Sequence, residues 1–224
     1  MKMIKQLLLL MGCLMPIVTN AQNFTKDEAK FLTKFFKTAT GMYTNQKQAE
    51  ITKNPHLRLS EARWFPVMKH RKGEFWISIG WYMPGDPKKP MGEKILHAVK
   101  TEDGKIEMEI YSFPKDFEDR KFLEWKKKNP YADLDPVQDL QKDDCSLSLE
   151  LADDGSYLMK CEEDVPCPIF SPLAPFDKIW FHFKMRPKQA LAFNKHYTPD
   201  GKLIIDYTQE PLEMDRVKRN PKTF

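Results

Sequence analysis

The chain of 224 residues is 41% hydrophobic and 30% charged, a composition that excludes a disordered tract and a bundle of membrane-spanning helices. Its formal net charge is only +4, and the densest basic run, Lys126–Lys128, has acidic residues on both sides. Because no basic stripe stands out, we expect no nucleic-acid partner. A chain of about 200 residues suffices for one well-buried core, so we expect one domain.

Residues 1–21 have the three regions of a secretory signal peptide. A basic start with Lys2 and Lys5 precedes an apolar run of about 12 residues, and the small residue Ala21 stands at the cleavage position. The apolar run is too short to span a bilayer, which takes about 20 residues. We therefore expect a periplasmic or extracellular protein whose mature chain, 22–224, keeps no transmembrane segment. An alternative cut at a lipobox-like stretch would leave a lipoprotein anchored through Cys13.

Two helices are predicted at the start of the mature chain. Thr25 and Glu28 have the spacing of a capping box, in which each side chain satisfies a free backbone N–H. Apolar residues then recur at helical spacing over 31–39, which predicts one face turned to a core. A second short helix is expected over 44–49, and a third, inserted helix over 119–128.

From residue 62 onward the hydrophobic pattern changes to period two, which is typical of half-buried β-strands. Asp103-Gly104 and Asp154-Gly155 predict tight hairpin turns, because glycine accepts a positive φ. The expected strands are 74–83, 94–100, 105–113, 145–151, 156–161, 179–185, 191–193 and 202–207.

This order of elements indicates the fold class. Helices followed by strands joined through hairpins argue against a parallel sheet and for a meandering barrel or sandwich. Roughly eight to ten strands favour closure. We predict a mainly β protein: a calycin-like antiparallel β-barrel with two N-terminal helices and one inserted helix.

Three cysteines remain once the signal is removed: Cys145, Cys161 and Cys167. Export to an oxidising compartment predicts one disulfide and one spare thiol. If Leu151 lies opposite Tyr157 in the hairpin, Cys145 is diagonal to Cys161, and the returning chain can bring Cys167 over Cys145. We expect a Cys145–Cys167 disulfide worth on the order of 3 kcal/mol. The cysteine spacing matches no common zinc pattern, so no metal site is expected.

The sequence contains no GxSxG, HExxH, GxGxxG or P-loop motif, and its five histidines are scattered. No catalytic residue is therefore assigned. Aromatic residues make up 12% of the chain and cluster in adjacent pairs. Core packing explains most of them, although a barrel that binds a flat apolar ligand would show the same pattern.

Several segments resemble the CpcT/CpeT family. Gly41-Met-Tyr-Thr-Asn-Gln-Lys-Gln-Ala49 is similar to a short family motif, and Ile106–Tyr111 resembles a family strand. The hairpin that runs from Cys145 through Gly155 to Cys167 resembles the family's Cys…Gly…Cys segment, with Cys161 at an apolar position of the family. The likeness extends over about residues 30–217. It also includes Arg63 with Pro66 and the closing segment 200–211.

The resemblance implies a calycin-like barrel, often dimeric, and it supports the Cys145–Cys167 pairing. It also implies a chromophore-lyase-like activity, in which a linear tetrapyrrole (a bilin) is bound and delivered to a cysteine of a phycobiliprotein. The bilin would be a ligand rather than a resident cofactor.

Two features favour an alternative function. Pro90-Met-Gly92 replaces a family segment with arginine, the natural partner of bilin propionates, and Ser78-Ile79 replaces Glu-Gln. In addition, bilin attachment is cytoplasmic, whereas this chain carries an export signal. The alternative is a non-enzymatic envelope β-barrel that binds another apolar small ligand.

The two faces of the strand 74–83 suggest where a ligand would bind. One face is purely apolar and is expected to pack in the interior or under the helices. The other combines small, polar and aromatic groups, which suits a cavity. Arg63 and Tyr111, on family-like segments, would supply a cation and a hydroxyl at its rim. The predicted ligand-binding residues are Arg63, Trp76, Ser78, Tyr82 and Tyr111.

Overall fold

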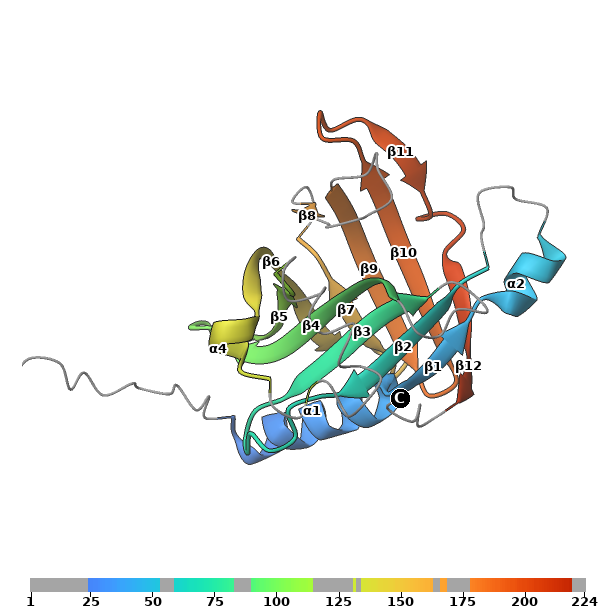
Figure 1. Ribbon diagram of the computed structural model, residues 1–224. Helices are drawn as coiled ribbons and strands as arrows, with labels where there is room; N and C mark the ends of the chain where they lie inside the picture. The colour runs from blue at the N-terminus through green and yellow to red at the C-terminus, as the bar shows by residue number, and fades with distance from the viewer. Residues whose placement is uncertain are drawn as a thin grey trace, which may run out of the picture.

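The computed structural model describes residues 24–52, 59–82, 90–114, 131, 134–162, 166–168 and 178–218 (Figure 1). The described helices are α1 (Lys26–Ala39), α2 (Gln46–Ile51) and α4 (Pro136–Asp139). The strands are β1 (Gly41–Thr44), β2 (Glu61–Pro66), β3 (Trp76–Tyr82), β4 (Pro90–Lys100), β5 (Ile106–Ser112), β6 (Gln141–Leu151), β7 (Tyr157–Lys160), β8 (Cys167–Pro168), β9 (Lys178–Arg186), β10 (Gln189–Tyr197), β11 (Leu203–Asp206) and β12 (Leu212–Lys218). The predicted signal peptide and the predicted inserted helix lie outside the described residues.

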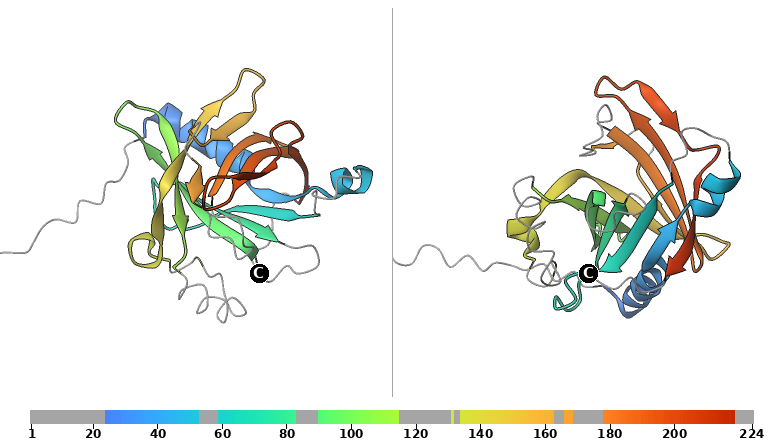
Figure 2. Two further views of the ribbon diagram at one scale, coloured as in Figure 1. Left: turned by 90° about the horizontal axis from the view of Figure 1, so that it is seen from above. Right: turned by 45° about the vertical axis from the view of Figure 1, so that its right-hand side comes forward.

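The sheet closes into an antiparallel barrel. Its strand order is β10-β12-β1-β2-β3-β4-β5-β6-β7-β9, and β9 pairs back with β10 along its whole length, which makes a ring of ten strands. The two short strands β8 and β11 extend the edges of β9 and β10 outside this ring. The closed form is visible in both views of Figure 2. The predicted calycin-like barrel is confirmed.

Local sequence signals determine the hairpins. Gly104 and Gly155 have φ values of +84° and +76°, as the tight turns after β4 and β6 require. In the β6–β7 hairpin Leu151 pairs with Tyr157, which is the predicted register. The two predicted N-terminal helices are also present, and the Thr25–Glu28 capping box is formed at the start of α1.

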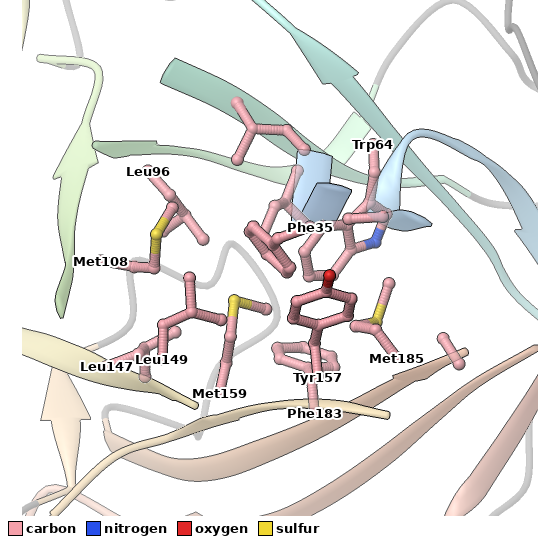
Figure 3. Packing of buried hydrophobic residues seen from close by; sticks show 14 of the residues in the cluster. Phe35, Trp64, Leu96, Met108, Leu147, Leu149, Tyr157, Met159, Phe183 and Met185 are labelled. Carbon is pink, nitrogen blue, oxygen red and sulfur yellow. The ribbon is translucent and has the colours of Figure 1, made fainter. Parts of the chain in front are cut away.

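Helix α1 lies across one end of the barrel and closes it (Figure 1). Its buried face carries Leu32, Phe35, Phe36 and Ala39. Phe35 contacts Tyr157 at the start of β7, with ring centroids 5.4 Å apart. Inward-facing side chains from the strands meet this helix and form one hydrophobic cluster, whose central members are shown in Figure 3. We call the opposite end of the barrel the distal end.

Besides β2 and β8, two strands that complete the ring, β1 and β12, were not predicted. β1 is only four residues long and lies between two helices, so it is too short to show an alternating pattern, although Tyr43 within it is fully buried. β12 is rich in charged residues, which hides its inward-facing Met214. Both strands are needed for closure, because β1 pairs with β12 and β2, and β12 pairs with β10.

A second hydrophobic cluster covers the outer face of the barrel at β2, β3 and β4. Tyr131, Leu134 and Leu140, which follow β5 in the sequence, pack on these strands, so that β3 is buried on both faces. The members of this outer cluster are Phe65, Val67, Met68, Trp76, Ile95, Phe113, Tyr131, Leu134 and Leu140. The outer face therefore forms a covered layer rather than a solvated surface.

Candidate functional site

All five predicted ligand-binding residues lie on the outer face of the sheet. Those on β3 alternate with Ile77 and Ile79, which belong to the interior cluster together with residues of α1. β3 contributes three of the five residues, and β2 and β5 contribute one each. Tyr82 and Ser78 are fully buried, Arg63 and Trp76 are buried, and Tyr111 is half-buried. The structure thus brings the five residues together in two groups along β3, facing away from the barrel interior.

The first group is formed by Arg63 and Tyr82. The Arg63 guanidinium lies 4.1 Å from the centroid of the Tyr82 ring and 3.3 Å from Glu61 Oε2. The ring lies back over Gly80, where an added Cβ would approach Tyr82 Cε2 to 2.7 Å. The Tyr82 hydroxyl is buried and makes no hydrogen bond within the described part of the chain. Burial raises the pKa of this hydroxyl above its usual value, and the negative charge of Glu93 adds to the effect.

Ser78 connects this group to the covering layer. Its hydroxyl donates to Glu93 Oε1 at 2.6 Å, and the Tyr131 hydroxyl donates to the same oxygen. Ser78 and Tyr131 are both almost completely buried. Glu93 is therefore held by two hydroxyl groups, one from the barrel and one from the layer over it.

The second group is centred on Trp76. Its ring stacks on His97 with centroids 3.8 Å apart, and Tyr111 contacts Trp76 at 5.3 Å. The Tyr111 hydroxyl donates to Glu109 Oε2 at 2.8 Å. The pKa of Glu109 is lowered to about 2 by His97, whose Nδ1 lies 3.9 Å away, and further by Lys142 and Tyr111. Burial and the Glu109 carboxylate raise the pKa of Tyr111.

A different set of polar residues faces the interior at the distal end. Lys94 pairs with Ile79 across β3 and β4, so its side chain lies on the interior face. Its ammonium group donates to Asp143 Oδ2 at 2.6 Å and to Ser112 Oγ at 2.5 Å, and Ser112 donates to Asp143 Oδ1 at 2.7 Å. The Lys94 and Asp143 side chains are 25% and 11% exposed, so this triad contacts solvent.

The opposite wall of the distal end is formed by β9 and β10. Asn194 and His196 follow the inward-facing Ala190 and Ala192 in the alternation, and His196 Nε2 lies 3.0 Å from Asn194 Oδ1. Burial lowers the pKa of His196. Half-buried Phe181 lies on the same face of β9.

Phe183 links the two walls. Its ring lies 5.4 Å from Phe181 and 6.5 Å from Trp81, which is half-buried at the end of β3. The rings lie beside polar side chains of the distal end: Phe181 pairs with Asn194, and Trp81 follows Ile79, the cross-strand partner of Lys94. The distal interior therefore combines aromatic surface with hydrogen-bonding groups.

The three cysteines also face the distal interior. The sulfur atoms of Cys145 and Cys167 lie at bonding distance and their Cα atoms are 5.5 Å apart, which is the geometry of the predicted disulfide. Cys161 is a buried free thiol whose sulfur lies 3.3 Å from that of Cys167.

The polar residues of the distal end were not predicted from the sequence. In β4 and β6, Lys94 and Asp143 stand at the same alternate positions as the inward-facing apolar residues. This alternation is the sequence signal that could have placed both side chains on the interior face. Within the described ranges, no group of His, Cys, Asp and Glu is placed to hold a metal ion. None of the described helices is both long enough and apolar enough to cross a membrane.

These features define the class as a calycin-like antiparallel barrel, closed by a helix at one end and lined with polar and aromatic groups at the other. No protein-family model and no curated protein matches the sequence.

Solved structures that are similar to this chain include two named proteins. The CRL protein of Arabidopsis has a TM-score of 0.60 and 11% identity over 85% of this chain and 98% of its own. The T-type phycobiliprotein lyase CpeT from Prochlorococcus phage P-HM1 has a TM-score of 0.46 and 9% identity over 83% and 96%. At this identity the similarity to CRL shows a shared fold alone.

Proposed function

We propose that the protein is an exported binding barrel for a small, flat and largely apolar molecule, held at the distal end. The observation that carries this proposal is the change in the interior face along the barrel axis. Near α1 the interior is filled by side chains such as Phe35, Trp64 and Met185, which are at most 1% exposed (Figure 3). At the distal end it carries half-buried aromatic rings and charged groups.

The distal groups fit a ligand with a flat body and a polar edge. The rings of Trp81 and Phe181 offer apolar surface to a ligand, and both rings pack against the buried ring of Phe183. Lys94 can donate hydrogen bonds and Asp143 can accept them. Binding sites for small molecules usually combine such apolar surface with a few polar groups that fix the orientation.

A linear tetrapyrrole is the member of this ligand class that the sequence resemblance indicates. It has a flat conjugated body, with pyrrole N–H donors and propionate acceptors along its edge. Lyase-like delivery of a bilin to an acceptor cysteine is the more specific form of the proposal. Its support is the likeness of residues 30–217 to the CpcT/CpeT family. The other form is a binding barrel for a different apolar molecule of the cell envelope.

The experiment is a titration of the purified mature protein with phycocyanobilin, followed by absorbance. Binding is expected to shift and sharpen the long-wavelength band, and no change at tens of micromolar would exclude a tetrapyrrole. Native mass spectrometry of protein purified from its own host then tests for another bound molecule. A mature chain without any bound small molecule in both experiments would exclude the binding function.

Matched variants locate the site. Lys94→Met removes an interior lysine, and Lys142→Met removes a lysine paired with Glu109 on the outer face. The distal site predicts that only Lys94→Met weakens binding. The outer layer, with Arg63, Trp76, Ser78, Tyr82 and Tyr111, is the alternative site. It predicts weaker binding by Tyr82→Phe, with Lys94→Met unaffected.

A further inference from the structure

The arrangement of the three cysteines indicates more than a structural crosslink. Cys161 follows β7, and its backbone N–H donates to Phe181 O on β9 at 3.1 Å. Cys167 in β8 pairs with Ile179, two residues away on the same edge of β9. Both cysteines therefore lie against the same stretch of β9. As a result, the sulfur atom of the free thiol Cys161 lies 3.3 Å from the sulfur atom of Cys167, which is itself at bonding distance from the sulfur atom of Cys145.

We propose that Cys145, Cys161 and Cys167 form a thiol–disulfide exchange centre, in which Cys145 and Cys161 alternate as the partner of Cys167. Cys161 loses its proton, and its thiolate attacks Cys167 Sγ. The Cys161–Cys167 bond forms as the Cys145–Cys167 bond breaks. Cys145 leaves as a thiolate and takes up a proton. One disulfide and one thiol are present before and after, so the step needs no oxidant or reductant.

The exchange changes which thiol can react. Cys161 is only 5% exposed, whereas Cys145 is half-buried and faces the distal interior. The step would therefore move the free thiol from an enclosed position to the end of the barrel that contacts solvent. Burial raises the pKa of the Cys161 thiol to about 11, so the resting protein holds this thiol protonated and exchange is slow near neutral pH.

Mapping of the free thiol tests this proposal. Oxidised mature protein is incubated under native conditions without added thiol or oxidant, samples are quenched in acid and alkylated, and trypsin then separates the cysteines. Cleavage after Lys142, Lys160 and Lys178 places Cys145 in peptide 143–160, and both other cysteines in peptide 161–178. The original pairing gives two crosslinked peptides with an alkylated Cys161. The exchanged pairing gives a disulfide within 161–178 and an alkylated Cys145.

We expect the label on Cys145 to increase with time in the wild-type protein and to be absent in Cys161→Ala. Wild-type protein labelled at Cys161 alone throughout the incubation would overturn the proposal. A label on Cys145 in Cys161→Ala would also overturn it, because the disulfide would then open without Cys161.

A second variant tests whether Cys161 and Cys167 lie close enough to form a disulfide, and this test does not require exchange. Cys145→Ser removes one partner and leaves Cys161 and Cys167 in contact. Oxidised glutathione is expected to convert these two thiols into a disulfide within peptide 161–178, while circular dichroism confirms that the barrel is folded. Two free thiols in the folded, oxidised variant would contradict the proposal.

Discussion

Glu109 is expected to make the stability of the protein dependent on pH in the acid range. Its carboxylate lies near His97 and accepts hydrogen bonds from Lys142 and Tyr111, and its side chain is only 19% exposed. These partners lower its pKa from 4.5 to about 2. One pKa unit corresponds to about 1.4 kcal/mol, so ionised Glu109 stabilises the folded state by on the order of 3 kcal/mol.

The direction of the pH dependence follows from the lowered pKa. In the folded protein Glu109 stays ionised at a pH where it is already protonated in the unfolded chain. Its contribution is therefore complete above about pH 4.5 and is lost as the pH falls towards about 2. Glu109→Gln removes the charge, so this variant is expected to be less stable than the wild type at pH 7. The two proteins are expected to converge near pH 2.

Urea unfolding followed by tryptophan fluorescence at several pH values between 7 and 2 measures this difference. Glu107→Gln is the matched control, because it removes a carboxylate from the same face of β5. Among the described contacts Glu107 accepts a hydrogen bond from Ser146 and forms no ion pair. If the stabilities of Glu109→Gln and the wild type remain parallel from pH 4.5 to 2, the assigned role of Glu109 is wrong.

Three further substitutions test other parts of the fold. Gly80→Ala is expected to push the Tyr82 ring from its position and to cost about 1–3 kcal/mol of unfolding free energy, and unchanged urea stability would contradict this packing. Phe35→Ala should cost about 3–5 kcal/mol, measured by the same unfolding assay, because it removes a fully buried ring from the helix that closes the barrel. Reduction of the Cys145–Cys167 disulfide should cost about 2–4 kcal/mol and lower the melting temperature, and an unchanged melting temperature would show that the bond is not formed.

The parts of the fold that the sequence predicts depend on local signals. The capping box of α1 and the Asp-Gly turns act within a few residues, so their outcome does not depend on distant parts of the chain. The register of the β6–β7 hairpin follows from its turn, and it was sufficient to favour the pairing of Cys145 with Cys167. By contrast, β1 and β12 carry no local pattern that predicts a strand, and only their pairing with the neighbouring strands shows that they are strands.

The prediction of the candidate site is limited in the same way, because a local pattern does not show which distant segments pack on each face of a strand. Period two correctly grouped Trp76, Ser78 and Tyr82 on one face of β3, because alternation determines which residues share a face. It does not determine which face turns inward. That choice depends on the interior cluster, in which Ile77 and Ile79 pack together with residues of α1 and other strands, and on residues beyond β5 that pack on the other face. Both faces of β3 are buried, so burial does not distinguish between them.

The interior faces at the two ends of the barrel therefore accommodate different kinds of side chain. At the α1 end, close packing of large apolar side chains provides stability, and a polar substitution there would leave an unpaired group in the core. At the distal end, Lys94, Ser112 and Asp143 satisfy one another, so charged groups can face the interior without that cost. Because Lys94 is partly exposed and Asp143 keeps its hydrogen bond from Ser112, substitution of Lys94 is expected to alter ligand binding more than folding. A variant such as Lys94→Met that loses ligand binding but keeps the urea midpoint of the wild type would show this separation, and a large loss of stability would contradict it.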